Sequence, residues 1–184
     1  RELAELDIEK VKMRSAVHTG AKLGAHGFDT VTFEISVNPG EPEKPLSKVA
    51  SGGELSRIML ALKNVLAEDD GIDSLVFDEV DTGVSGRAAQ KVAEKLAQVS
   101  RRKQVLCVTH LPQLAAMADV HFSVEKGERT GRTFTEVERL SRERRMVELA
   151  RLTSGERITG ATLEAAGELL DSAERFKRAL TQQK

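Results

Sequence analysis

The chain has 184 residues and a formal net charge of −1, with 40% apolar and 31% charged side chains. Such values are ordinary for a globular domain, and the overall charge gives no sign of a nucleic-acid or membrane binder. The single cysteine, Cys107, excludes a disulfide within the chain and favours a reducing compartment. No stretch approaches the roughly 18 apolar residues of a membrane span, and the charged N-terminus is unlike a signal peptide.

The first part of the chain predicts a helix, a strand and a second helix. Residues 1–15 mix spaced apolar residues with charges and lack glycine and proline, which favours a helix. Apolar and polar residues alternate in 30–38, which predicts a half-buried strand. A loop with three prolines then leads to a helix from about residue 52. Its apolar residues recur at helical spacing: Leu55, Ile58, Met59, Leu62, Val65 and Leu66.

The second part alternates short apolar runs with amphipathic helices and therefore predicts a parallel α/β core. Because the two runs in the core are apolar throughout, we expect their sheet to be covered on both faces. An antiparallel hairpin and two helices follow. The expected elements are strand 74–77, helix 85–100, strand 104–109, short helix 111–118, hairpin strands 119–126 and 133–140, helix 141–152 and helix 159–182.

Two acids, Asp78 and Glu79, end the run SLVFDE. The carboxyl ends of parallel strands face the crevice in which α/β sheets bind ligands. In a nucleotide site the first acid would hold Mg²⁺, which prefers oxygen ligands, and the second would accept a proton from attacking water. The pair is also compatible with acids that end a strand simply by entering solvent.

Two adjacent glycines open the helix at residue 52, although glycine is about 1 kcal/mol worse than alanine in a helix interior. Ser51 and Glu54 fit a capping box, but a capping box does not explain Gly52 and Gly53. A phosphate does explain them. A helix N-terminus offers free N–H groups, and the missing side chains allow close approach. The two interpretations are compatible, with the Ser51 hydroxyl as a further donor.

A histidine, His110, follows the second apolar strand. An isolated histidine at this place is commonly a hydrogen-bonded structural residue. The other histidines are dispersed and there is one cysteine, so we expect no zinc site. The SGGE, DE and His motifs are separated each time by one helix and one strand. We therefore expect all three at one edge of the fold.

These motifs resemble, in order, those of ABC-type ATPases in the form used by SMC-like proteins. ASGGELSR is similar to their signature motif, LVFDE to the Walker B strand, VDTGVSG to the D-loop and VTHLPQLAAMAD to the His-switch segment. The longer segments, including RITGATLEAAGELL near the end, resemble the RecN family of bacterial recombinational repair ATPases. The resemblance runs from about Phe28 onward. It implies an α/β fold, the C-terminal half of an ABC-type ATPase head, with a parallel sheet core flanked by helices and an antiparallel hairpin.

The resemblance divides the chain in two. Residues 1–19 would be the end of a coiled-coil helix that returns to the head, and residues 20–184 the C-terminal lobe of the head. The Walker A loop G-x-x-x-x-G-K-[ST] does not occur in the sequence. In the family this loop lies in the N-terminal half. We therefore expect the chain to need the N-terminal lobe of the same protein for ATP and Mg²⁺, and not to hydrolyse ATP alone.

The resemblance also implies site residues. The signature motif would bind the γ-phosphate of an ATP held by a second head, and the D-loop would connect the two sites. The acids would position Mg²⁺ and deprotonate water, and the histidine would contact the γ-phosphate. The implied residues are Ser51, Gly52, Gly53, Glu54 and Asp81 for nucleotide binding, Glu79 and His110 for catalysis, and Asp78 for the metal.

As partners the resemblance implies a second head, joined through sandwiched ATP, and double-stranded or broken DNA, with no membrane. The protein would be cytoplasmic and associated with the nucleoid, and would act in the repair of double-strand breaks. Two other interpretations stay open. One is a nucleotide-binding subunit of another ABC class, such as a transporter. The other is a non-catalytic interaction module, in which DE and SGGE are strand-end acids and an ordinary helix cap.

Overall fold

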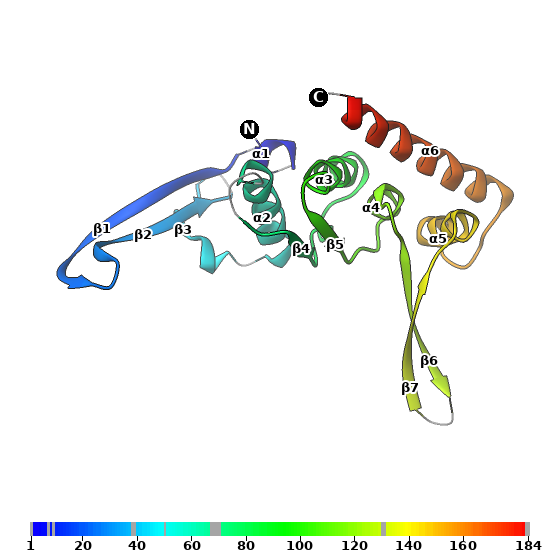
Figure 1. Cartoon of the computed structure of the whole chain (residues 1–184), viewed down its shortest axis with the longest axis horizontal. Helices are drawn as coiled ribbons and strands as arrows, with labels where there is room; N and C mark the ends of the chain where they lie inside the picture. The colour runs from blue at the N-terminus through cyan, green and yellow to red at the C-terminus, as the bar shows by residue number, and fades with distance from the viewer. Residues whose placement is uncertain are drawn as a thin grey trace.

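The computed structural model describes residues 2–6, 8, 10–37, 40–49, 51–66, 71–129 and 132–182. Asn38 of the expected strand and Ala50 of the ASGGELSR segment lie outside these residues. A helical body carries two projecting β-hairpins (Figure 1). The elements are α1 Glu2–Glu5, β1 Lys12–Gly24, β2 Gly27–Ser36, β3 Lys44–Pro45, a 3₁₀ turn Leu46–Lys48, α2 Gly52–Leu66, β4 Ser74–Phe77, α3 Gly86–Val99, β5 Gln104–Cys107, α4 Pro112–Met117, β6 Phe122–Arg129, β7 Arg132–Arg139, α5 Arg142–Ser154 and α6 Gly160–Gln182.

Three sheets organise the described strands. The order in the first is β1-β2-β3, all antiparallel, and β6 and β7 form an antiparallel hairpin. The strands β4 and β5 pair in parallel, from Ser74 opposite Gln104 to Phe77 opposite Cys107. Their carboxyl ends therefore lie side by side, as the expected α/β core requires.

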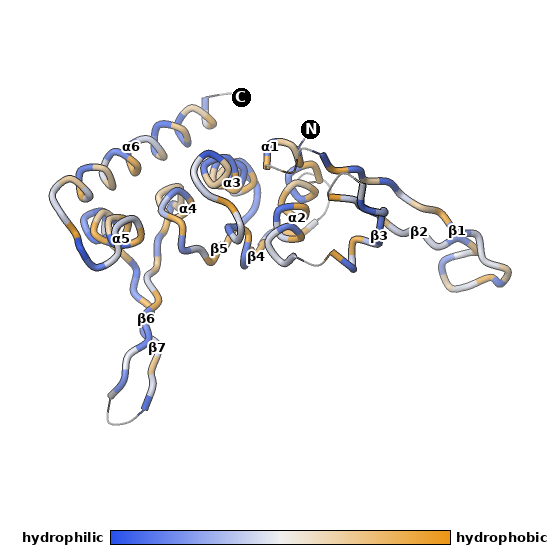
Figure 2. The backbone as a smooth tube through the Cα atoms, turned by 180° about the vertical axis from the view of Figure 1, so that it is seen from behind, coloured by the Kyte–Doolittle hydropathy of each residue, from blue (hydrophilic) through white to orange (hydrophobic). Residues whose placement is uncertain are grey.

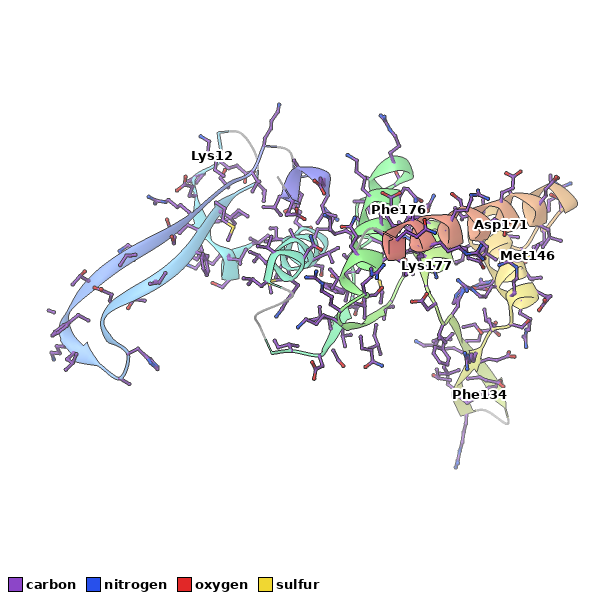
Figure 3. All side chains as sticks on the ribbon, turned by 45° about the horizontal axis from the view of Figure 1, so that its top comes forward. Lys12, Phe134, Met146, Asp171, Phe176 and Lys177 are labelled. Carbon is purple, nitrogen blue, oxygen red and sulfur yellow. The ribbon has the colours of Figure 1, made fainter. Side chains whose placement is uncertain are left out.

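The main core lies between the helices that follow the parallel strands. Four apolar residues at helical spacing on α3 are buried, at 7% exposure or less. They are Ala89, Val92, Leu96 and Val99. Helix α6 packs across this group, with Phe176 against the core, and the neighbouring Lys177 donates to Asp119 Oδ1 at 2.7 Å (Figure 3).

The caps of α5 also agree with the sequence. The Ser141 hydroxyl accepts a hydrogen bond from the Arg144 backbone N–H at 3.4 Å, as an N-cap residue does. The helix ends at Gly155, whose φ of 69° lies in the left-handed region. Glycine reaches this region at little cost, so it is a common residue just after a helix.

A buried cation joins the first helix to α3. The side chain of Lys95 is 6% exposed, and its Nζ lies 2.7 Å from Glu2 Oε2 and 2.9 Å from Glu5 Oε2. Burial lowers the pKa of Lys95, but the hydrogen bonds and charges of the two glutamates outweigh it and leave the pKa raised. Glu2 also accepts a hydrogen bond from Asn64 of α2.

The helix expected over residues 1–15 is wrong beyond its first turn. Helix α1 ends at Glu5, and a strand begins at Lys12. Strand β2 supplies the reason, because Met13 lies opposite Ile35 and Val17 opposite Val31. Cross-strand apolar pairs stabilise a sheet and override a weak helix propensity. Residues 12–19 are therefore not the end of a coiled-coil helix, and the rest of the division at residue 19 stays a prediction.

Among the residues that the structure describes, helices cover one face of the parallel sheet only, so the expectation of two covered faces is wrong for this part of the chain. Leu75 and Phe77 are buried against the helices, whereas Val76 is 71% exposed, Leu106 50% and Val108 63%. The hairpin β1–β2 is likewise only partly covered. Its strand β2 is buried at Ile35 but exposed at Val31 and Phe33. Apolar residues also run along both hairpins in Figure 2.

Candidate functional site

Three segments meet beyond the carboxyl end of β4. The first turns of α2 contact the turn that follows β4. Ser56 donates to the backbone carbonyl of Asp78 at 2.8 Å, and Arg57 donates to the carbonyl of Thr82 at 2.7 Å. The third segment, 109–110, follows β5 and contacts Asp81 of the same turn. The expectation that SGGE, DE and His lie at one edge is therefore confirmed.

The two glycines of α2 are explained by packing within this chain. A Cβ on Gly53 would lie 2.7 Å from the Thr82 carbonyl oxygen and 2.9 Å from its Cβ. A Cβ on Gly52 would collide with Oε2 of Glu79. An incoming phosphate is therefore not needed to account for the glycines, and the expected phosphate contact stays a prediction. The turn after β4 already requires the close approach.

The structure shows the Ser51 half of the expected capping box. The Glu54 backbone N–H donates to the Ser51 hydroxyl at 3.4 Å. Ser51 thus satisfies one of the free donors of the first turn. The Glu79 carboxylate lies over the same turn, beside Gly52. A negative group is favourable there, because the helix dipole is positive at this end.

The two acids after β4 are both exposed. Asp78 Oδ1 accepts a hydrogen bond from the backbone N–H of Glu79 at 2.9 Å. Glu79 has a φ of 58°, the one positive value among the non-glycine residues that the structure describes. Such a conformation costs a non-glycine residue free energy and often occurs at functional sites. It directs the chain from the strand into the turn that presents both carboxylates.

Asp81 joins the turn after β4 to the segment after β5. Its side chain is 4% exposed, and its Oδ2 accepts from the Thr109 hydroxyl at 2.6 Å and from the His110 backbone N–H at 3.0 Å. The Nδ1 atom of His110 lies 3.1 Å from the same oxygen. Thr109 in turn accepts from the Leu111 N–H. The imidazole is 73% exposed, so Asp81 orients a ring that faces solvent.

Cys107, at the end of β5, lies near these acids. Burial, followed by the charges of Asp81 and Asp78, raises the pKa of its thiol to about 12. The thiol therefore stays protonated at neutral pH. Since the thiolate is the nucleophilic form, Cys107 suits a structural role and not a catalytic one.

The described residues contain no group of three or more His, Cys, Asp or Glu side chains that could hold a metal ion by itself. Mg²⁺ beside a nucleotide usually takes one or two carboxylates together with phosphates and water. The exposed carboxylate of Asp78 can supply one such ligand. The phosphate ligands would have to come with a nucleotide, for which this sequence has no Walker A loop.

Sequence analysis missed three residues that build the site. Ser56 and Arg57 fasten α2 to the turn after β4, and Thr109 fastens the histidine segment to Asp81. Each lies within a motif that was identified: Ser56 and Arg57 end ASGGELSR, and Thr109 directly precedes the histidine. Arg57 is 7% exposed, although at 100° per residue it lies away from the apolar stripe of α2, so the helical pattern gave no signal for it.

The fold is that of an ATPase head of the SMC type. A crystal structure of an SMC head bound to the C-terminal winged-helix domain of ScpA aligns with a TM-score of 0.53 and 22% identity, covering 79% of this chain and 42% of that one. The mixed α/β class with its parallel pair and antiparallel hairpins is thereby confirmed. No family model matches the chain.

The sequence matches proteins named DNA repair protein RecN over most of its length. It is 50% identical over 180 residues to the protein of Halalkalibacterium halodurans, which covers 96% of this chain. It is 52% identical to that of Bacillus subtilis over 85% of the chain, and 46% identical to that of Vibrio cholerae over 92%. The resemblance to RecN is confirmed. The chain spans about a third of these relatives, at 32%, 27% and 31% of their lengths.

No helix among the residues that the structure describes is both long and apolar enough to cross a membrane. Helix α6, the longest of them at 23 residues, carries charged residues along its length.

Proposed function

We propose that this chain is the C-terminal part of a RecN-like ATPase that acts in recombinational repair of DNA double-strand breaks. ATP would join two heads through the signature motif, and hydrolysis would release them. The observation that carries the proposal is the meeting of α2, the turn after β4 and the segment after β5 at one place. Each of these segments brings one motif of the ATPase class.

The open face of the parallel sheet supports a requirement for the N-terminal lobe. Parallel sheets occur almost only with both faces covered. Here Val76, Leu106 and Val108 of the second face are half exposed or more. The RecN relatives are about three times as long as this chain, so they contain a segment that could cover this face and carry a Walker A loop.

In the proposed reaction the residues of this chain act by position and charge. Glu79 orients and deprotonates the attacking water, and Asp78 supplies a ligand to Mg²⁺. His110 contacts the γ-phosphate. Ser51 and the first N–H groups of α2, at Gly52 and Gly53, bind the γ-phosphate of the opposite head, which requires the Glu79 carboxylate to leave the place that it occupies beside Gly52.

The remaining assignments belong to the same proposal. Glu54 holds the first turn of α2 through its N–H bond to Ser51, and Asp81 links the two nucleotide sites. Since Asp81 is almost fully buried and bonded within its own chain, such a link would act through the turn that it stabilises. DNA, as broken ends or duplex, is the proposed partner of the whole assembly.

Co-expression of the chain with the missing N-terminal lobe tests the proposal. We expect ATPase activity from the complex, none from the chain alone, and loss of turnover in Glu79→Gln with ATP binding retained. Glu156→Gln, an exposed glutamate in the α5–α6 connection, is the matched control and should hydrolyse ATP normally. Wild-type turnover in Glu79→Gln would remove Glu79 from the role of base.

A further inference from the structure

Arg57 is a charged residue buried in the candidate site. It is 7% exposed, and its Nη1 atom donates a hydrogen bond to the carbonyl oxygen of Thr82 at 2.7 Å. Gly53, one helical turn earlier on α2, packs closely against the same Thr82. Arginine is almost never fully buried unless it is paired. No role proposed above for the signature motif uses this side chain, so its contact with Thr82 has to be explained separately.

Thr82 closes the turn that carries the proposed base, Glu79. The backbone N–H of Thr82 donates to the Glu79 carbonyl oxygen at 3.0 Å, while the Thr82 carbonyl accepts from Arg57. Glu79 has a φ of 58°, and a non-glycine residue keeps such a conformation only where the surrounding structure holds it. Between the two ends of the turn, Val80 is 0% and Asp81 4% exposed. The core therefore anchors the middle of the turn, and Arg57 anchors its end.

We propose that Arg57 is a positioning residue for ATP hydrolysis, which acts through Thr82 to hold the backbone of Glu79 in the conformation that places the base. The proposal rests on the role proposed above for Glu79. Arg57 lies on the signature helix, whose tip would contact the nucleotide of the opposite head, whereas the turn would serve the nucleotide of its own head. The bond to Thr82 fixes the tip and the turn relative to each other. Because a displacement of about 1 Å can cost about 100-fold in rate, loss of this bond should affect turnover more than nucleotide binding.

The hold on the turn can be measured without nucleotide, by hydrogen–deuterium exchange of the full-length protein followed by mass spectrometry. In Arg57→Met, peptides that contain residues 79–84 should exchange about 10-fold faster than in wild type, because the Thr82 N–H leaves its bond more often. Arg57→Lys keeps a cationic donor on a flexible stem and should exchange at an intermediate rate. Arg57→Gln, which is polar but shorter than arginine, replaces Arg57→Met if that variant does not fold.

The effect on the reaction is measured by steady-state ATP hydrolysis of the same full-length variants. We expect the kcat of Arg57→Met to fall about 10- to 100-fold, with KM near the wild-type value, and Arg57→Lys to recover part of the loss. Arg145→Met is the matched control, because it removes another arginine that donates to backbone carbonyls, here at the end of α4. It should leave both kcat and the exchange of residues 79–84 unchanged.

The outcomes separate the two proposals. Wild-type exchange of residues 79–84 in Arg57→Met would overturn the role of Arg57, as would an unchanged kcat or a kcat that falls equally in Arg145→Met. Failure of the wild-type protein to hydrolyse ATP would count against the proposed ATPase function, and the exchange rates would still decide whether Arg57 holds the turn.

Discussion

The close packing of α2 on the turn after β4 predicts different costs for its two glycines. At Gly53 an added Cβ meets the backbone of Thr82, whose carbonyl is held by a 2.7 Å bond from Arg57. This neighbour cannot move without loss of that bond. At Gly52 the added Cβ meets the far end of the Glu79 side chain, which can rotate away.

The two effects can be compared in magnitude. Overpacking in a well-packed region costs about 1 to 3 kcal/mol. Alanine instead of glycine returns up to about 1 kcal/mol of helix propensity, and this gain is available at both positions. We therefore expect Gly52→Ala to be at least as stable as wild type, with a gain of up to about 1 kcal/mol. Gly53→Ala should be less stable than Gly52→Ala by about 1 to 3 kcal/mol.

Urea denaturation followed by circular dichroism measures this difference, provided that the slopes of the unfolding curves agree between variants. Because both variants gain the same helix propensity of alanine over glycine, this gain cancels when their stabilities are compared. Equal stability of Gly52→Ala and Gly53→Ala would refute the packing argument. It would return the glycine pair to an explanation by an incoming phosphate alone.

Three further predictions concern other parts of the chain. Ser51→Arg should abolish ATP-dependent dimers of the full-length protein by filling the space at the start of α2, and light scattering that still finds such dimers would argue against the contact between heads. Arg145→Met removes the donor to three carbonyls at the end of α4 and should lower the free energy of unfolding by about 2 kcal/mol. Arg145→Lys should have a stability between those of wild type and Arg145→Met. An unchanged urea midpoint in Arg145→Met would contradict this prediction. Burial, and then the charge of Arg145, lowers the pKa of His121 from 6.5, so the unfolded chain binds its proton more readily and stability should fall as the pH drops below about 6.5. His121→Gln should weaken this pH dependence of the urea midpoint, and identical profiles would exclude His121 as its source.

The central part of the fold was predictable because its signals are local. In α3 apolar residues recur at a helical period, and four of them, Ala89, Val92, Leu96 and Val99, are buried in the structure. The parallel strands are apolar and short, and each ends in the polar residues of a motif. For these elements the local pattern and the tertiary packing favour the same structure, so the sequence alone is sufficient.

The N-terminal segment was not predictable by the same reasoning. Its first fifteen residues suit a helix when taken alone, and the partner that makes a strand of Lys12–Gly24 lies further along the chain. Likewise, the open face of β4 and β5 could not be read from the residues. The apolar pattern of a strand is the same whether the second face of its sheet is covered by this chain or by another segment.

The candidate site was predictable in its membership but not in its contacts. The motifs indicated which residues gather, and the structure brings them together. The contacts are a different matter, because the turn between Glu79 and Thr82 determines what lies over the glycines. The bonds that Asp81 Oδ2 accepts from Thr109 and His110 likewise depend on the pairing of β4 with β5, which lie about thirty residues apart in the sequence. Only coordinates reveal such bonds.

The buried cation of α3, Lys95, connects α1 to α3, and the N-terminus of α3 lies next to the candidate site. Separating Lys95 from both glutamates would leave an unpaired charge in the interior, at a cost of about 3 to 5 kcal/mol. A force that displaces α1 is therefore transmitted to α3 through the ion pairs of Lys95. Since α3 begins at Gly86, shortly after Asp81, the force arrives at the loop that orients the histidine.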